Sequence, residues 1–331
     1  YYVSEVLHLC FTIYFSGKAV FATNLNAFLI TGAGSGLGRG ALEYLLSKGD
    51  TIIAVDINEK VLLELAERYD QKEECGTKPR LLPVVMDITN TESVRDGMEK
   101  IRKVYGDKCL DAVVNFAGVM RGGPLMEMRD KDFHMVFNIN VLGTFNVNKY
   151  SFPLLKRHDP AFRARIVNVG SEVSLCQVSA GFAAPYSASK FAIEGYSTGL
   201  RQEMMFIDNP AHIVVINPGA METPMNIVGN KGELNAFMLE HTVHCPDTEW
   251  EHALRPGQAV AHNYIQKNMR PAILVAEAVF KAVHFHQPPR RFAVNVSYEM
   301  RLASVTPQII LDHATALGMK FHSRNSKPKV E

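Results

Sequence analysis

Short apolar runs alternate with longer amphipathic stretches from residue 27 to about residue 300. Each run is four to six residues long and mostly apolar, which is typical of a strand buried on both faces of a parallel sheet. The stretches between the runs repeat apolar residues at helical spacing. Strands are expected at residues 27–30, 51–55, 81–86, 110–115, 164–169, 213–216 and 291–296. This pattern predicts an α/β fold in which helices cover both faces of a parallel sheet.

A glycine-rich turn follows the first apolar run directly. It reads Thr31-Gly32-Ala33-Gly34-Ser35-Gly36-Leu37-Gly38 and leads into a helical pattern that ends at Gly49. Strand, turn and helix in this order predict a dinucleotide-binding loop. Glycines let the backbone approach a pyrophosphate, and the helix N-terminus stabilises its charge. The spacing is Thr-Gly-x-x-x-Gly-x-Gly rather than Gly-x-Gly-x-x-Gly. The alternative is a glycine-rich turn that binds no ligand.

The second strand ends at Asp56, 18 residues past Gly38. A carboxylate at this place can accept hydrogen bonds from the adenosine ribose hydroxyls and would repel a 2′-phosphate. Neither Ser35 nor Ile57 supplies the positive charge that such a phosphate needs, so the sequence favours NAD over NADP. Asp56 could also cap the helix expected at residues 58–69, and the two roles are compatible.

The next two strand ends also carry candidate cofactor contacts. The third strand leads into Asp87 and Ile88, and the Asp87 carboxylate could reach the adenine or could cap the helix that follows. The fourth strand ends at Asn115. The small residues Ala117 and Gly118 come soon after it, and they would let the backbone pass close to a cofactor ribose.

Polar residues in otherwise apolar surroundings extend the candidate site. Asn140 lies inside the helical region expected at residues 131–156, where Asn is poorly favoured, so we expect it to have a specific partner or role. Ser171 follows the fifth strand, at the sheet edge where open parallel sheets bind ligands. Its hydroxyl could meet a ligand there, and Ser174 and Ser179 are alternative candidates for that hydroxyl.

Tyr186 and Lys190 open a helix expected at residues 185–206. Residues four apart lie on one helical face, so the phenol and the ammonium can point into one cleft. A neighbouring cation would lower the pKa of the phenol and make it a usable acid or base near neutral pH. Taken alone, this spacing is also that of a half-buried aromatic residue beside a solvated lysine.

Composition describes an ordinary globular protein. Apolar residues make up 47% and charged residues 21% of the 331, and the net charge is +1. Basic residues are spread along the chain, so no nucleic-acid-binding surface is expected. The five cysteines are scattered and form no Cys-x-x-Cys pair, which indicates a reducing compartment. A cluster of His and Cys matches no zinc spacing, so no metal site is predicted; it comprises His241, His244, Cys245, His252 and His262.

Residues 1–26 are expected to form an N-terminal extension. Their apolar stretch is shorter than a membrane span, so a helix packed on the domain and a remnant of a membrane anchor both stay open. Residues 221–270 form a long insertion with Met and aromatic residues, expected as a lid over an adaptable apolar pocket. The tail at residues 301–331 is expected to be helical. Location is expected to be intracellular, either cytoplasmic or on an internal membrane.

The ordered set of motifs resembles the short-chain dehydrogenase/reductase family, in its single-domain branch. The matching motifs are Thr31-Gly-x-x-x-Gly-x-Gly38, Asn115-Phe-Ala-Gly118, Asn140, Ser171, Tyr186-x-x-x-Lys190, and Pro218-Gly219 through Thr223. The resemblance covers about residues 27–300. It implies one Rossmann-like domain with sheet order 3-2-1-4-5-6-7, and a homodimer or homotetramer built through two long helices.

The resemblance also implies a role for each matching position. Tyr186 would be the catalytic acid/base, Lys190 would bind the nicotinamide ribose and lower the pKa of Tyr186, Ser171 would polarise the substrate oxygen, and Asn140 would hold a water. The expected cofactor contacts are Gly32, Ser35, Gly36, Leu37, Gly38, Asp56, Asp87, Ile88, Asn115, Ala117, Gly118, Tyr186, Lys190, Pro218, Gly219 and Thr223. The family has a second Asn where this chain has Phe116, which puts the geometry of that loop in doubt.

Within the family the C-terminal part looks most like the retinol, 17β-hydroxysteroid and 3-hydroxybutyrate dehydrogenases. The expected function is hydride transfer between NAD and a largely apolar alcohol or ketone, with steroid-, retinoid- and hydroxy-acid-like substrates all open. A catalytically silent nucleotide-sensing or interaction protein on the same fold is the alternative. A sugar-nucleotide epimerase shares Tyr-x-x-x-Lys, but it expects differently spaced glycines.

Overall fold

The computed structural model describes most of the region expected to form the domain. The described residues are 27–69, 79–156, 163–176, 179, 182–208, 210–226, 243, 248–303, 305, 306 and 310. The N-terminal extension, much of the insertion and most of the tail therefore lie outside the described residues.

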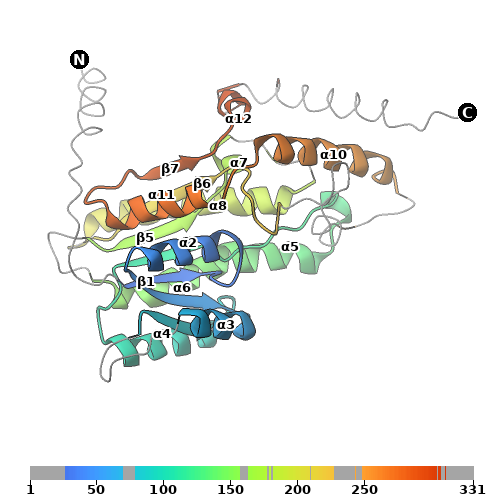
Figure 1. Ribbon diagram of the computed structural model, residues 1–331. Helices are drawn as coiled ribbons and strands as arrows, with labels where there is room; N and C mark the ends of the chain where they lie inside the picture. The colour runs from blue at the N-terminus through green and yellow to red at the C-terminus, as the bar shows by residue number, and fades with distance from the viewer. Residues whose placement is uncertain are drawn as a thin grey trace, which may run out of the picture.

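One parallel sheet of seven strands runs through the molecule (Figure 1). Its order is β3-β2-β1-β4-β5-β6-β7, as the resemblance implies. The strands are β1 (Ala27–Thr31), β2 (Thr51–Asp56), β3 (Leu81–Val85), β4 (Ala112–Asn115), β5 (Arg165–Val169), β6 (His212–Pro218) and β7 (Arg291–Val294). Because all neighbours are parallel, their carboxyl ends share one edge, where a doubly wound sheet binds ligands.

Helices cover both faces of this sheet. The first face is packed by α2 (Gly36–Ser47), α3 (Glu59–Tyr69) and α11 (Ile273–His284), and the second by α4 (Thr91–Tyr105), α6 (Thr144–Ser151) and α8 (Ala184–Glu203). The other helices are η1 (Leu125–Glu127), α5 (Asp130–Phe137), η2 (Asn138–Gly143), η3 (Phe152–Leu154), α7 (Glu172–Cys176), η4 (Met204–Phe206), α10 (Glu251–Asn268) and α12 (Tyr298–Ala303).

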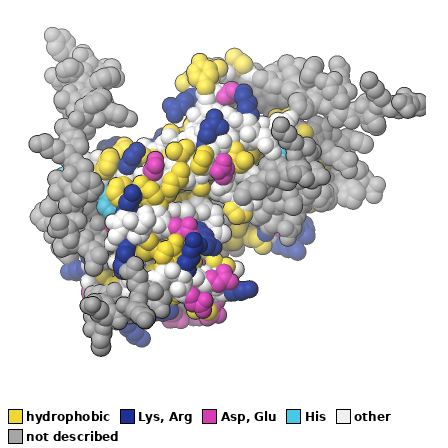
Figure 2. All heavy atoms as spheres, in the orientation of Figure 1, with side chains coloured by type: hydrophobic (Ala, Val, Ile, Leu, Met, Phe, Trp, Pro, Cys, Tyr) yellow, Lys and Arg dark blue, Asp and Glu magenta, His cyan; other side chains and the backbone are white. Residues whose placement is uncertain are grey.

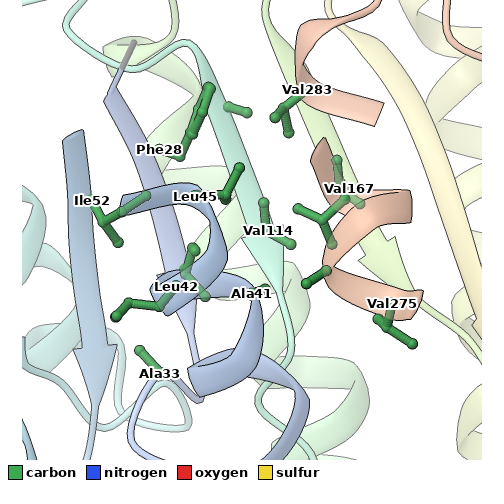
Figure 3. Close-up of a cluster of buried hydrophobic side chains, with 14 of the residues drawn as sticks. Phe28, Ala33, Ala41, Leu42, Leu45, Ile52, Val114, Val167, Val275 and Val283 are labelled. Carbon is green, nitrogen blue, oxygen red and sulfur yellow. The ribbon is translucent and has the colours of Figure 1, made fainter. Parts of the chain in front are cut away.

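Alternate side chains of each strand supply two separate cores. In β1, Phe28 and Ile30 belong to the cluster under α2 and α11, whereas Leu29 belongs to the cluster on the opposite face. Figure 3 shows Leu45 of α2 beside Phe28 and Leu42 one turn away, near Ala33, within the first cluster. Burial on both faces explains why the strands are continuously apolar in sequence.

Several element boundaries differ from those expected. The helical region expected at 131–156 is divided into α5, the π-helical segment η2, α6 and η3, because the hydrogen-bond pattern shifts around Asn140. The fourth strand begins at Ala112 rather than at Leu110, which forms only an isolated bridge with Leu155. Within the insertion, residues 251–268 form α10, and within the tail only α12 and a few following residues are described.

Charged and apolar side chains are mixed on the surface, and Figure 2 shows hydrophobic side chains gathered over α12. Tyr298 and Leu302 of that helix are exposed. Among the described residues no helix combines the length and apolar character needed to cross a bilayer, and no cluster of His, Cys, Asp and Glu could hold a metal ion.

Truncation of Leu45 tests the first core. Leu45 is fully buried between α2 and the sheet, so Leu45→Ala is expected to lower the free energy of unfolding by about 2–5 kcal/mol through lost burial and a residual cavity. Leu63→Ala on the exposed side of α3 is the control and is expected to change it by less than about 0.5 kcal/mol. Equal losses in a urea titration would contradict this account of the core.

Candidate active site

A cavity of about 380 Å³ lies at the carboxyl edge of the sheet. It gathers segments that are far apart in the sequence: the turn after β1, the loop after β4, the end of β5, the start of α8 and the segment after β6. Of the sequence-predicted site residues, those lining it are Gly32, Ser35, Gly36, Leu37, Gly38, Ala117, Gly118, Ser171, Tyr186, Lys190, Pro218, Gly219 and Thr223.

Close backbone packing shapes the glycine-rich turn. Gly32 has a φ of +64°, and a Cβ at this position would lie 2.9 Å from the backbone N of Ala117. A Cβ at Gly38 would lie 2.2 Å from the carbonyl oxygen of Gly32. Side chains therefore do not fit there, and the N-terminus of α2 borders the cavity directly. Bare backbone beside a helix N-terminus suits a pyrophosphate.

Asp56 and Asp87, the two predicted adenosine contacts, lie outside the lining of the cavity. Asp56 Oδ2 accepts a hydrogen bond of 2.9 Å from the backbone N–H of Gly34, so its carboxylate adjoins the glycine turn. Asn58, rather than Asp56, accepts a hydrogen bond at the first turn of α3, from the N–H of Val61. The Asp87 carboxylate accepts hydrogen bonds from the N–H and hydroxyl of Thr89.

Asn90 rather than Asp87 caps α4, since its side chain accepts from the backbone N–H groups of Glu92 and Ser93. The alternative prediction, that Asp87 caps this helix, is therefore wrong. Ile88 is buried, and a Cβ at Gly143 would lie 2.5 Å from it, so its side chain packs against η2.

Asn115 contributes to the frame of the site. Its amide donates 2.7 Å and 2.9 Å hydrogen bonds to Asn148 Oδ1 and Asn168 Oδ1. This three-asparagine cluster joins β4, α6 and β5 in a buried position. Phe116, which replaces the family's second Asn, lines the cavity, while the N–H of Ala117 bonds to the Thr31 hydroxyl at 3.1 Å.

Asn140 links the loop after β4 to α8. Its side chain accepts a 2.8 Å hydrogen bond from the N–H of Val119 and donates a 3.0 Å bond to the carbonyl of the same residue. It also donates a 2.9 Å bond to Ser189 Oγ. The expectation of specific partners for this Asn is confirmed, and these partners hold Gly118 beside Lys190.

Lys190 and Tyr186 lie one helical turn apart in α8. The Lys190 ammonium is buried, donates a 2.9 Å hydrogen bond to the carbonyl of Val169 at the end of β5, and lies 5.6 Å from the centre of the Tyr186 ring. Burial lowers the pKa of Lys190 to about 8. Burial also raises the pKa of Tyr186, although a hydrogen bond with Ser171 opposes the rise.

The pKa shift of Tyr186 is thus opposite in sign to the one expected from a neighbouring lysine. Desolvation of the phenolate outweighs the hydrogen bond with Ser171, the charge of Glu172 adds to the rise, and burial also disfavours the charged form of Lys190. The two groups are pushed toward their neutral forms together.

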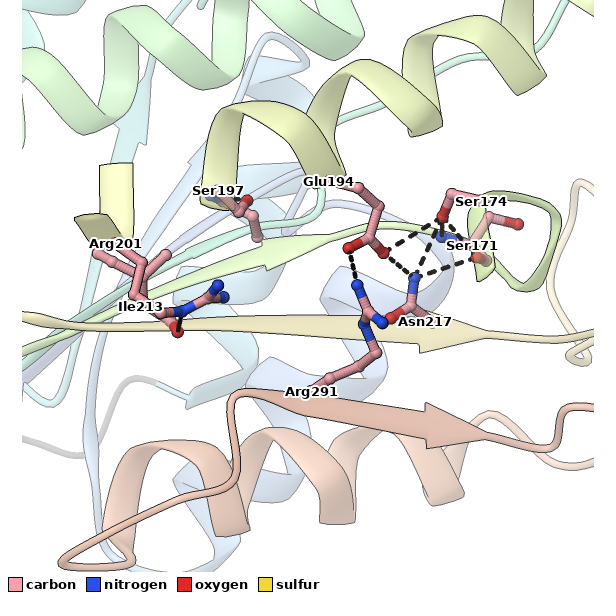
Figure 4. A network of polar contacts seen from close by, with 9 residues as sticks. Ser171, Ser174, Glu194, Ser197, Arg201, Ile213, Asn217 and Arg291 are labelled. Carbon is pink, nitrogen blue, oxygen red and sulfur yellow. Dashed lines mark hydrogen bonds and ion pairs between the residues drawn. The ribbon is translucent and has the colours of Figure 1, made fainter. Parts of the chain in front are cut away.

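A polar network fixes the backbone at Ser171 (Figure 4). The Ser174 hydroxyl donates a 2.7 Å hydrogen bond to the carbonyl of Ser171, and the amide of Asn217 donates a 3.1 Å bond to the same oxygen. Glu194 accepts from Asn217 and pairs with Arg291. Of the three candidate serines only Ser171 lines the cavity, while Ser174 holds its backbone.

Two residues near the site were not identified from the sequence. Arg121 lines the cavity from the loop after β4, where nothing in the local pattern distinguishes it. Glu172 follows Ser171 directly and is buried. Burial raises its pKa to about 7, and hydrogen bonds from Tyr264 and from the Ser297 backbone oppose the rise. A charged residue three positions after an apolar strand was the available signal.

Comparison with known proteins places this geometry in a family. Residues 26–233 match the family model for the short chain dehydrogenases. The chain belongs to this family. Its relatives include the 3-oxoacyl-[acyl-carrier-protein] reductase FabG of Thermotoga maritima, 31% identical over 60% of this chain and 74% of the relative. They also include 17-beta-hydroxysteroid dehydrogenase type 6 of Rattus norvegicus, 32% identical over 59% of this chain and 57% of the relative.

Retinol dehydrogenase 7 of Rattus norvegicus is 30% identical over 59% of this chain and 56% of its own length. The matches to the two rat proteins therefore span little more than half of those relatives. A short chain dehydrogenase from Burkholderia phymatum, solved in complex with NAD, has a TM-score of 0.68 at 21% identity, covering 89% of this chain and 97% of that chain. A short-chain dehydrogenase from Streptomyces avermitilis has a TM-score of 0.66 at 22% identity, covering 92% and 100%. Both share the fold.

The raised pKa of Glu172 predicts a pH dependence of stability. Its pKa of about 7 in the folded chain exceeds the ordinary value of 4.5, so the folded state binds an extra proton. The resulting stability is present below about pH 4.5 and is lost as the pH rises through 7. The difference in the free energy of unfolding between Glu172→Gln and wild type is therefore expected to change with pH. It should increase in favour of Glu172→Gln by on the order of 2–3 kcal/mol from pH 4.5 to 8.

Urea titrations at several pH values measure this difference. The exposed Glu67 of α3, changed to Gln, is the control and should follow the wild-type pH dependence closely. Parallel curves for Glu172→Gln and wild type would show that Glu172 ionises normally in the folded chain.

Proposed function

We propose that this protein is an NAD-dependent oxidoreductase that converts a largely apolar secondary or primary alcohol to a ketone or aldehyde, and the reverse. The observation that carries the proposal is the convergence of Ser171, Tyr186 and Lys190 on one cavity that also contains the glycine-rich turn. The reaction is alcohol plus NAD⁺ giving carbonyl compound, NADH and one proton.

The cavity fits a dinucleotide. Backbone packing at Gly32 and Gly38 leaves a cradle without side chains at the N-terminus of α2, and no acidic residue is among the described residues that line the cavity. The glycine turn would hold the pyrophosphate, Asp56 the adenosine ribose, Lys190 the nicotinamide ribose and Thr223 the carboxamide. When bound, the nicotinamide would supply the hydride acceptor.

The chain's own residues would handle the proton. The Tyr186 phenolate would take the hydroxyl proton of the alcohol, and Ser171, held by Ser174 and Asn217, would donate a hydrogen bond to the substrate oxygen as negative charge develops. Burial disfavours both the Tyr186 phenolate and the Lys190 ammonium. Polar contacts from a bound ligand to the Lys190 ammonium would stabilise its charged form, and the ammonium would then favour the phenolate.

An apolar substrate is supported by the residues that line the cavity beyond the cofactor segments. Phe116, Val119, Met221 and Met225 all line it, and Arg121 is the one charged side chain there, apart from Lys190, among the described residues. The names of the two rat relatives refer to steroid and retinol substrates, which are of this class. A homodimer or homotetramer is proposed as well, and the exposed Phe133, Leu142 and Phe145 supply apolar surface for it.

Removal of the Tyr186 hydroxyl tests the acid/base assignment. Tyr186→Phe is expected to lower kcat by about 10³-fold, because general acid/base catalysis is lost while the shape of the cavity is kept. NADH binding, measured by fluorescence titration, should stay within a few-fold of wild type. Tyr150→Phe on α6 is the control. Turnover of Tyr186→Phe near the wild-type rate on an alcohol panel would refute the role of Tyr186.

The carboxylate of Asp56 tests cofactor preference. Asp56→Asn removes the charge that would repel a 2′-phosphate, so the ratio of kcat/KM for NAD to that for NADP is expected to fall by about tenfold or more. Glu59→Gln, three residues further on and exposed in the first turn of α3, is the matched control. An unchanged ratio in initial-rate assays would place the adenosine ribose elsewhere.

A further inference from the structure

A buried carboxyl group that the proposed reaction does not use stands directly beside Ser171. Glu172 is the first residue of α7, and its side chain faces away from the cavity lining into the junction between α7, α10 and α12. Figure 1 shows these three helices at the same end of the molecule. A buried carboxyl is costly without partners, so its contacts indicate what it does.

Those contacts come from three other segments. The Tyr264 hydroxyl of α10 lies 2.8 Å from Glu172 Oε2 and 3.1 Å from Ser297 Oγ, in the link between β7 and α12. A Cβ at Gly219 would lie 2.9 Å from the same Glu172 oxygen, so the carboxyl also packs against the segment after β6 that lines the cavity. One side chain thus connects the segment of Ser171 to α10.

A second contact fixes α10 to the same segment. A Cβ at Gly257 would lie 2.2 Å from the Phe182 ring, so the ring packs directly on the helix backbone. Phe182 in turn accepts a 2.7 Å hydrogen bond from the N–H of Gly123. Gly257 and Tyr264 are two helical turns apart, and their partners at 172 and 182 both lie between Ser171 and Tyr186.

The charge of Glu172 acts on the proposed base. Ionised Glu172 raises the pKa of Tyr186, and it also raises the pKa of the Cys176 thiol in its own helix. The other titratable and charged groups around this junction are Tyr264 of α10 and, from α12, Glu299 and Arg301. Glu299 pairs with Lys267 on the surface, and Arg301 bonds to the carbonyl of Val296.

We propose that Glu172 is a positioning residue that fastens α10 to the segment carrying Ser171 and Tyr186. The inference rests on the proposed function, in which Tyr186 is the base. A residue with a merely structural role would serve equally well at every pH. Glu172 directly follows Ser171, which bonds to Tyr186, so a charge on Glu172 is expected to act on Tyr186 as well. A pH profile tests this electrostatic role, and the mobility of α10 tests the fastening role.

The first experiment compares kcat/KM for alcohol oxidation by wild type and Glu172→Gln between pH 5.5 and 9.5. Gln keeps the size and a hydrogen-bond acceptor for Tyr264 but never carries charge. At pH 5.5 the two rates are expected to agree within about twofold. The rising limb of Glu172→Gln is expected about one pH unit lower, because a negative charge that raises the pKa of Tyr186 is removed. Equal loss of rate at every pH would overturn the electrostatic role.

The second experiment needs no catalysis. Hydrogen exchange of residues 251–268 is measured in the full chain for wild type, Tyr264→Phe and the exposed control Tyr298→Phe. Tyr264→Phe is expected to speed exchange in α10 by about fivefold, which corresponds to one lost hydrogen bond. Wild-type exchange in Tyr264→Phe would overturn the fastening role.

The two proposals fail differently. If no alcohol is oxidised by the wild type, the proposed function fails, while the exchange experiment still decides whether Tyr264 and Glu172 fasten α10. If oxidation is observed and Tyr186→Phe is inactive, but Glu172→Gln shows no shift in its profile, the function stands and the electrostatic part of the inference fails.

Discussion

A buried ammonium at the end of β5 sets the conditions for the whole candidate site. Lys190 is buried away from water, so its charged form depends on polar groups of the protein. The sheet edge supplies the carbonyl of Val169, which accepts a hydrogen bond from the ammonium. That contact requires α8 to pack closely on the sheet at this height. The buried Ser187 and Ser189 permit it, and Ser189 also bonds to Asn140. Displacement of α8 by a fraction of a turn would leave the ammonium unpaired, which is costly in a dry environment.

Burial away from water affects three titratable side chains near the site together. It disfavours the charged forms of Lys190, Tyr186 and Glu172, so the pKa of the lysine falls while those of the phenol and the carboxyl rise. Groups this close titrate as a coupled set rather than singly. A ligand that brings charge or polar contacts into the cavity would therefore change several protonation equilibria at once, which is a way for binding to prepare a site for chemistry.

Features fixed by local pattern could be predicted from the sequence, and features fixed by distant partners could not. The strands followed from continuous apolar runs such as Ile52 to Val55, which are buried on both faces. The environment of Glu172 depends on Tyr264 and Ser297, about 90 and 125 residues further along the chain by the printed sequence, so no window around Glu172 could show it. The predicted direction of the pKa shift of Tyr186 was also wrong, because the spacing shows that a cation is near but does not show how far the phenol is removed from water.

The three-asparagine cluster behind the cavity has a consequence of a different kind. Asn115, Asn148 and Asn168 join the carboxyl ends of β4 and β5 to α6 through neutral amides, and the hydroxyls of Tyr196 and Ser197 accept hydrogen bonds from the same cluster. Amides neither gain nor lose protons across the pH range in which Glu172, Lys190 and Tyr186 change their charge. The spacing of the strand ends is thus insensitive to acidity and to screening by salt. The titrating groups are thus attached to a frame whose own hydrogen bonds stay the same while their charges change, so the positions of the strand ends do not depend on pH even where the stability of the fold does.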